Sequence, residues 1–358
     1  MTILTKYIAR EFLNVFFLGL SAFVIIYLTI DILENIDDFI KEGVPFSTTM
    51  EFFMFKIPLI VVQVAPVATL LSSLISLGIL SRNSEVVAMR ASGISVYRII
   101  TPIIGISLLV SVGSLIGNES ILPYTNQRVK YIEHTALENK SPYGFFQQNR
   151  IWYRSNNAIY NIDIFDPKGS TLKGITIYYF DGEFNLIRRI DAKMAKWVNQ
   201  KWYFHEISSR SFDNGAEVSM ERWHEKIIPL PEVPDDFKIV EKSADEMSYT
   251  ELRSYTKKIR NEGFDATKYV VDMHAKLAFP FVSLIMPLLG VPFALKTGRG
   301  KGIVRGVGIS IIISFVYWAM LAVSLSLGHS GVLPPVVSAW VSNFIFLMVG
   351  IFMLLHVA

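Results

Sequence analysis

The sequence predicts an α-helical membrane protein with six transmembrane helices and an inserted all-β domain. Four charge-free apolar runs cover residues 12–30, 57–81, 99–118 and 277–295, and residues 306–358 contain no Asp, Glu, Lys or Arg. A helix needs about 20 apolar residues to cross the hydrocarbon core of a bilayer. Of the 65 charged residues, 46 lie between Glu119 and Lys276, a stretch too polar to lie in lipid.

The last charge-free run is long enough for two spans. It is broken in the middle by residues 328–331 (Gly-His-Ser-Gly) and by Pro334-Pro335, which predict a turn. The expected organisation is therefore three spans with a short cytoplasmic helix near residues 82–93 (residues 1–123), a soluble domain (residues 124–262), and three further spans (residues 263–358).

Composition excludes several classes of function. The chain has no Cys, which rules out disulfides, thiolate metal sites and cysteine nucleophiles. Its net charge of +3 indicates no nucleic-acid partner. We predict no catalytic residues, no cofactor and no resident metal.

The short loops predict the orientation in the membrane, because short basic loops tend to remain cytoplasmic. Basic residues dominate the loops on one side: Lys6, Arg10, Arg82, Arg90, Arg98, Lys296, Arg299, Lys301 and Arg305. Acidic residues dominate the segment between the first two spans on the other side: Asp31, Glu34, Asp37, Asp38, Glu42 and Glu51. We therefore expect both termini in the cytoplasm and the soluble domain outside it, in the periplasm of a bacterium.

The soluble domain is predicted to consist of β-strands. From Arg150 onward, short alternating apolar and polar runs flank turn signals at residues 155–157, at Asp181-Gly182 and at Asn199-Gln200. Strands at this spacing suggest an antiparallel sandwich or an open roll. Its aromatic residues form either a closed core or an apolar groove for a lipid tail or a partner strand. A helix over residues 248–262 leads back to the membrane, and Ser248 with Glu251 has the spacing of a capping box.

Signals for catalysis are weak. Residues 298–302 (Gly-Arg-Gly-Lys-Gly) look like a phosphate loop but lack its first Gly and its Ser or Thr, so a flexible basic turn is the better interpretation. Asp272, His274 and Lys276 lie beside the fourth span. Two interpretations of these residues stay open, a proton relay and simple contact with water at the membrane boundary.

The segment between the second and third spans, residues 81–95, predicts a short cytoplasmic helix that begins near Ser84 and stops at Gly93. It leaves apolar surface beside Glu85 and Arg90 and could lie on lipid or dock into a groove of a partner. Glu85 in the first turn is also favoured by the helix dipole alone, by a few tenths to ~1 kcal/mol, so its residue type does not by itself establish a function.

This segment closely resembles the cytoplasmic coupling segment of a known family. RNSEVVAMRASGIS (residues 82–95) is similar to that of the lipopolysaccharide-export permeases, the LptF/LptG (YjgP/YjgQ) family, and its ASG ending is closer to the LptG branch. The resemblance extends over essentially the whole chain, and its other landmarks are KYIAREF at the start, residues 37–43, Glu119 with Pro123, RIWYRSNNAIYNI, GITIYYF and PLLGVPFAL.

The resemblance implies a β-jellyroll-like periplasmic domain and a non-catalytic subunit of an ATP-driven exporter in the bacterial inner membrane. The implied partners are an LptF-type permease in a heterodimer, an LptB-type ATPase dimer, an LptC-type bitopic protein, and lipopolysaccharide. The residues implied in ATPase coupling are Arg82, Glu85, Met89, Arg90 and Gly93. The residues implied in substrate contact are Lys41 and Lys130.

Two departures and three alternatives stay open at this point. Glu34 and Ile40 stand where some members of the family carry lysines, and Lys41 could simply extend to the interface as long basic side chains do. Another ABC-type permease for an envelope lipid or lipoprotein, an intramembrane enzyme, and a scaffold that moves no lipid are the competing classes. Lipoprotein-releasing permeases resemble a four-span layout, which this chain contradicts.

Overall fold

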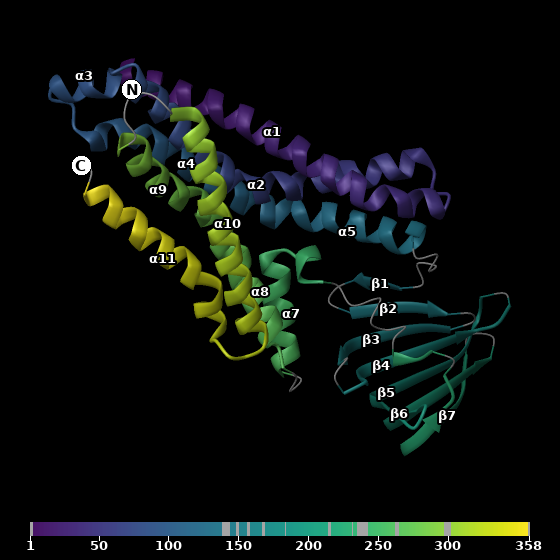
Figure 1. Cartoon of the computed structure of the whole chain (residues 1–358). Coiled ribbons are helices and arrows are strands. Elements are labelled where there is room, and N and C mark those ends of the chain that lie inside the picture. Colours follow the sequence, from purple (N-terminus) through teal and green to yellow (C-terminus); the bar gives the residue numbers. More distant parts are fainter. Residues whose placement is uncertain are drawn as a thin grey trace. The chain divides into compact units, whose positions relative to one another are not determined.

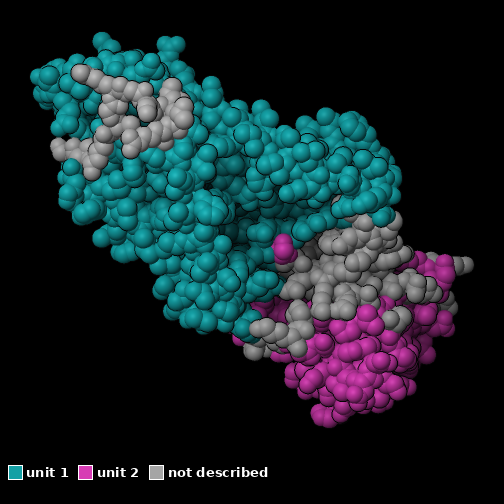
Figure 2. All heavy atoms as spheres, viewed as in Figure 1, with its two compact units in different colours: residues 1–137, 244–256, 265–358 teal, residues 138–243, 257–264 magenta. Residues whose placement is uncertain are grey.

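The computed structural model describes residues 3–137, 144–147, 150–155, 158–166, 169–182, 184–213, 216–230, 232–234, 243–261, 265–296 and 302–356. The chain forms two compact units (Figure 2). We call the first the membrane unit; it comprises Met1–Leu137, Ala244–Thr256 and Asp265–Ala358. We call the second the β unit; it comprises Glu138–Ser243 and Lys257–Phe264.

The membrane unit confirms the six predicted spans, because six of its helices are long and apolar enough to cross a bilayer. They are α1 (Ile3–Lys41), α2 (Phe46–Arg82), α4 (Val96–Ser120), the composite fourth span of α8 (Thr267–Ala278), η3 (Phe279–Phe281) and α9 (Val282–Lys296), then α10 (Gly302–His329) and α11 (Pro335–Leu355) (Figure 1). The predicted break between the last two lies where Gly331 adopts a φ of +78°.

α2 and the fourth span form the centre of the membrane unit. In their most apolar windows 61% and 67% of the residues are buried, against 17% in α1, 28% in α10 and 33% in α11. α9 crosses α2 at Gly290, where an added Cβ would lie 2.0 Å from Ser73 Oγ and 3.2 Å from the Leu70 carbonyl oxygen. Small residues let helices approach this closely in membranes, so glycine is required at this crossing.

Three shorter helices complete the membrane unit: α3 (Glu85–Ala91), α5 (Leu122–Ile132), which follows α4, and α7 (Tyr249–Asn261), whose first residues belong to this unit. The predicted capping box of α7 is confirmed in both directions. The Ser248 N–H donates to Glu251 Oε2 at 3.0 Å, and the Glu251 N–H donates to Ser248 Oγ at 3.1 Å. Glu119 at the end of α4 also accepts from the Tyr249 N–H at 2.8 Å and from the Thr250 hydroxyl, so α4 fixes the start of α7.

The described strands of the β unit form a single antiparallel sheet in the order β1-β2-β3-β4-β5-β6-β7. They are β1 (Gly144–Gln147), β2 (Arg150–Ser155), β3 (Ala158–Asp166), β4 (Thr171–Phe180), β5 (Leu186–Val198), β6 (Lys201–Asp213) and β7 (Ala216–Ile228). The β2–β3, β4–β5 and β5–β6 pairs confirm the three predicted hairpins. Asn156 and Asn157 of the first predicted turn lie outside the described residues. The jellyroll itself stays a prediction.

The regular pairing of the sheet is interrupted along a line that crosses four strands, where Asp163, Gly174, Lys193 and Glu206 are left out of the paired register. Successive side chains of a strand point to opposite faces, so residues on one face are normally two positions apart. Across this line the core residues of each strand are three positions apart. Two rows of paired residues nevertheless join one apolar core: Ile162, Ile175, Ala192 and Ile207, then Phe165, Leu172, Ala195 and Phe204. Between these rows Gly174 has a φ of +59°, and its Cβ would lie 2.1 Å from Asp163 Oδ2. This interruption lets both rows cover the same core.

Candidate functional site

The predicted short helix between the second and third spans is α3. The chain reverses on both sides of it, because Ser84 has a φ of +60° and Gly93 a φ of +81°. An added Cβ at Gly93 would meet nothing within 4 Å, so glycine is favoured there for its left-handed backbone and not for space. The helix begins at Glu85 and ends at Ala91, as the sequence predicted.

α3 presents one face to the apolar core and another to solvent. Val86 and Met89 are 5% and 8% exposed and belong to the core that also contains residues of α2 and α9. Val87 is 56% exposed, and Arg90 is exposed as well. Met89 therefore lies on the inward face and Arg90 on the outward face, a division that the sequence did not reveal.

Glu85 is held in place by two neighbours. The Asn83 Nδ2 donates to Glu85 Oε1 at 3.1 Å, and the Tyr7 hydroxyl from α1 is hydrogen-bonded to the same carboxylate. Arg82 is exposed, and neither Arg82 nor Arg90 forms an ion pair within the described part of the chain. Glu85 at the start of α3 is thus a positioned carboxylate, and the guanidinium groups of Arg82 at the end of α2 and Arg90 in α3 are exposed.

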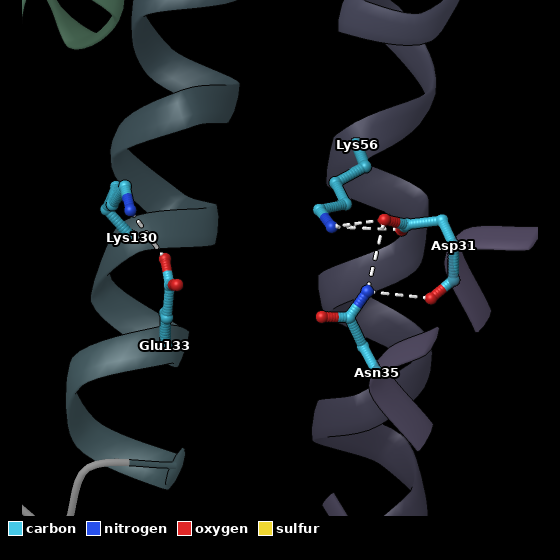
Figure 3. Close-up of polar contacts among 5 residues, drawn as sticks. All are labelled: Asp31, Asn35, Lys56, Lys130 and Glu133. Carbon is cyan, nitrogen blue, oxygen red and sulfur yellow. Dashed lines mark hydrogen bonds and ion pairs between the residues drawn. The ribbon is translucent and has the colours of Figure 1, made fainter. Parts of the chain in front are cut away.

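Lys41 and Lys130, the two candidate substrate lysines, both carry a local acidic partner. Lys41 in the last turn of α1 lies 3.7 Å from Asp38 Oδ1, and the two side chains are 72% and 64% exposed. Lys130 in α5 donates to Glu133 Oε2 at 2.7 Å (Figure 3). Exposed pairs of this kind contribute little stability, so both ammonium groups remain available to a stronger anion.

A half-buried ion pair that the sequence analysis missed joins α1 to α2. Lys56 Nζ lies 2.8 Å from Asp31 Oδ1 and 2.9 Å from Oδ2, with the side chains 22% and 13% exposed. Asn35 Nδ2 donates to the Asp31 carbonyl at 2.7 Å and to its Oδ1 at 3.2 Å (Figure 3). Charged residues within spans are costly unless they are paired. The signal in the sequence that could have revealed this pair is Lys56 itself, an isolated lysine directly before the second apolar run.

The ends of α1, α2 and α5 are packed together beside these charges. Phe39, Phe52 and Phe53 form an aromatic cluster with Val129 and Ile132, and their ring centroids lie 4.9 to 6.0 Å apart. Arg128 of α5 donates to Glu51 Oε1 of α2 at 2.6 Å, and this ion pair raises the pKa of Arg128. Lys41, Lys56 and Lys130 therefore all lie on helices that this cluster joins.

The other candidates belong to other elements of the chain. Asp272 Oδ1 lies 2.7 Å from His329 Nε2, so α8 is bound to the end of α10, and the Asn118 Nδ2 donates to a backbone carbonyl of α8. Of the loop that resembles a phosphate site, residues 297–301 lie outside the described part of the chain. His205 lies 4.0 Å from Glu225 on the β unit.

Six apolar helices with a β-sheet inserted between the third and the fourth define a multi-pass membrane protein with a polar domain. The chain belongs to the lipopolysaccharide export system permease LptF/LptG family, whose model matches residues 6–356. Membership makes it a transport permease of the inner membrane. Its resemblance to the LptG branch is confirmed by relatives that are LptG permease proteins.

These relatives are distant but cover most of the chain. The lipopolysaccharide export system permease protein LptG of Escherichia coli strain K12 is 23% identical over 294 residues, which is 81% of each chain. LptG of Haemophilus influenzae is 24% identical over an alignment of 359 positions, which covers 96% of each chain. Both alignments are long enough to include membrane helices and the inserted domain.

Proposed function

We propose that this chain is the LptG-type permease subunit of an ATP-driven exporter that extracts lipopolysaccharide from the inner membrane and passes it to a periplasmic bridge. The observation that carries the proposal is α3, a short helix fixed to the apolar core by Val86 and Met89 while Glu85 and Arg90 stay accessible. A helix with one face in the core and charges on the other is suited to transmit movement of a docked partner to the spans.

Within this proposal the coupling residues have different tasks. Arg82, Glu85 and Arg90 contact the groove of an LptB-type ATPase, since their charges are accessible. Met89 transmits the movement inward, because it packs in the core. Gly93 supplies the left-handed turn that returns the chain to α4.

The partner permease is expected on the apolar faces that the membrane unit leaves exposed. Large apolar side chains are exposed on α1, α10 and α11, including Phe17, Leu18, Ile312, Phe315, Phe344 and Phe352. Such faces meet lipid or another helix in a membrane. We propose that an LptF-type permease covers part of them and that the acyl chains of lipopolysaccharide occupy the space between the two permeases, with Lys41 and Lys130 toward the phosphates. An LptC-type protein would bind the β unit.

The orientation that we propose, with both termini cytoplasmic and the β unit periplasmic, can be tested with single cysteines because the chain has none. Gly182 lies in an exposed turn, and an added Cβ there meets nothing within 4 Å. We expect Gly182→Cys to react with an impermeant maleimide in spheroplasts, and Lys6→Cys to react only after lysis. The reverse pattern would contradict the proposed direction of export.

Copurification tests the function itself. The chain is expressed with its genomic neighbours and native partners, purified in mild detergent, and its bound proteins and lipids are identified by mass spectrometry. We expect an ATPase, a second permease and lipopolysaccharide. A different envelope lipid or a lipoprotein in place of lipopolysaccharide would support the alternative cargo. An ATPase-free complex without bound lipid would support the scaffold.

A further inference from the structure

The fourth span, residues 267–295, is one helix that is interrupted by a single 3-10 turn, and we call this turn the break. α8 ends at Ala278, a 3-10 turn occupies Phe279–Phe281, and α9 begins at Val282. Pro280 lies in this turn. Proline has no N–H, so the carbonyl of Lys276, four residues earlier, loses its helical donor. The Phe279 N–H does not replace it, because it donates to the Ala275 carbonyl.

Side chains of other spans bind the carbonyls at this break. The Asn118 Nδ2 of α4 donates to the Lys276 carbonyl at 3.2 Å. The Asn343 Nδ2 of α11 donates to the Ala278 carbonyl at 2.6 Å, where the Val282 N–H has turned to Phe279 instead. Tyr317 of α10 completes the group, since its hydroxyl donates to Asn343 Oδ1 at 2.7 Å. In lipid an unsatisfied carbonyl is costly, so these donors stabilise a break that would otherwise be unfavourable.

The two halves of the fourth span share α11 as a neighbour but differ in their other neighbours. α8 packs chiefly against α10 and α11, whereas α9 packs chiefly against α2, α4 and α11. α9 also shares its apolar core with Val86 and Met89 of α3. This core also contains Tyr317 and Leu321 of α10 but no described residue of α8, so a displacement of α3 reaches α9 directly and α8 only through other elements.

One buried group beside the break has no partner. Ser283 is 1% exposed and lies in the first turn of α9, and its hydroxyl makes no hydrogen bond in the described structure. A buried hydroxyl without a partner is unfavourable. The first turn of α9 thus contains a buried hydroxyl without a hydrogen bond, whereas the two open carbonyls on the α8 side each have a donor. Such a hydroxyl is expected where a segment adopts a second arrangement in which the hydroxyl has a partner.

We infer that the break at Pro280 is the hinge on which α9 moves relative to α8 during transport. Asn118 and Asn343 are then positioning residues, because they bind the two carbonyls that lack a helical N–H donor at this hinge. This inference rests on the proposed function for its transport step. The hydrogen bonds themselves do not depend on it, and the two parts can be tested separately.

The first test is a double-mutant cycle on the thermal stability of the complete complex purified in nanodiscs. We expect Asn118→Ala to lower the unfolding midpoint by a few degrees in the parent. In a Pro280→Ala background, residue 280 supplies its own N–H to the Lys276 carbonyl, so Asn118→Ala should have at most half of that effect. Ser283→Ala, buried but without a hydrogen bond, is the matched control and should not lower the midpoint. An equal loss in both backgrounds would overturn the role of Asn118.

The second test measures ATP-driven release of lipopolysaccharide from proteoliposomes. We expect Pro280→Ala to transport several-fold more slowly than the parent while its unfolding midpoint is unchanged or higher, a combination that a purely structural proline would not produce. Tyr317→Phe, which removes only the hydroxyl from the group at Asn343, should also change the rate. Parent-like transport by Pro280→Ala would overturn the hinge. A parent complex that moves no lipopolysaccharide would overturn the proposed function and the hinge's transport role, and the stability cycle would still decide the hydrogen bond.

Discussion

Glu85→Ala is expected to abolish ATP-driven release of lipopolysaccharide while the permease still inserts into the membrane. In the proposed complex the Glu85 carboxylate contacts the ATPase. Removing one partner of a buried charge pair at an interface typically costs ~2–5 kcal/mol, which corresponds to a loss of affinity of about 30-fold or more. ATPase retention during purification and lipid release from proteoliposomes are the two measurements.

Tyr7→Phe separates a contact with the partner from a local structural role. The Tyr7 hydroxyl is hydrogen-bonded to the Glu85 carboxylate, so this variant loosens Glu85 but keeps its charge. We expect most of the transport to remain. Equal losses in Tyr7→Phe and Glu85→Ala would show that Glu85 acts through the local structure, and parent-like transport by Glu85→Ala would refute the coupling role.

Lys41→Glu is expected to reduce binding of lipopolysaccharide more strongly than Lys41→Ala. An ammonium group next to a lipid phosphate makes charge-assisted hydrogen bonds, roughly twice as strong as neutral ones. Glutamate removes this attraction and adds repulsion, and it also lies beside Asp38. Photocrosslinking of lipopolysaccharide from a probe at position 40, where the side chain is 69% exposed, measures the difference among the parent and the two variants.

Two further variants control for general effects of charge. Lys41→Arg keeps the cation and should bind as the parent does. Lys193→Glu changes a lysine of similar exposure, 73%, which is paired with Glu206 on the β unit, and it should leave the crosslinking yield unchanged. Identical yields in the parent, Lys41→Ala and Lys41→Glu would mean that Lys41 merely extends to the membrane interface.

The sequence predicted elements better than it predicted contacts. The six spans, the three hairpins, the turn at Gly331 and the capping box of Ser248 and Glu251 follow from local rules, since each depends on residues close together in the chain. The α3 segment was also predicted from Ser84 to Gly93. Which of its residues face inward could not be predicted, because seven residues with no clean apolar stripe leave the direction of the helix open.

The contacts that define the candidate sites join residues far apart in the chain. Asp31 and Lys56 are 25 positions apart, and Asn118 and the Lys276 carbonyl are 158 apart. No prediction was drawn from Pro280 in the sequence, and no residue near it in the chain shows that Asn118 from another span would bind the carbonyl. The resemblance to the family directed attention to Lys41 and Lys130 and did not reveal the more deeply buried Lys56.

The sequence by itself determined the number of spans, the position of the inserted domain and the short helix between α2 and α4. It could do so because a bilayer excludes unpaired charge and favours helices, which satisfy nearly all of their backbone hydrogen bonds internally, so the pattern of apolar residues is almost sufficient. Only the tertiary structure decided that Met89 faces the core, that Asp31 pairs with Lys56, and that Asn118 and Asn343 bind the broken fourth span. Those contacts depend on how the helices pack against one another. The pattern of hydrophobicity along the chain does not distinguish one packing of the helices from another.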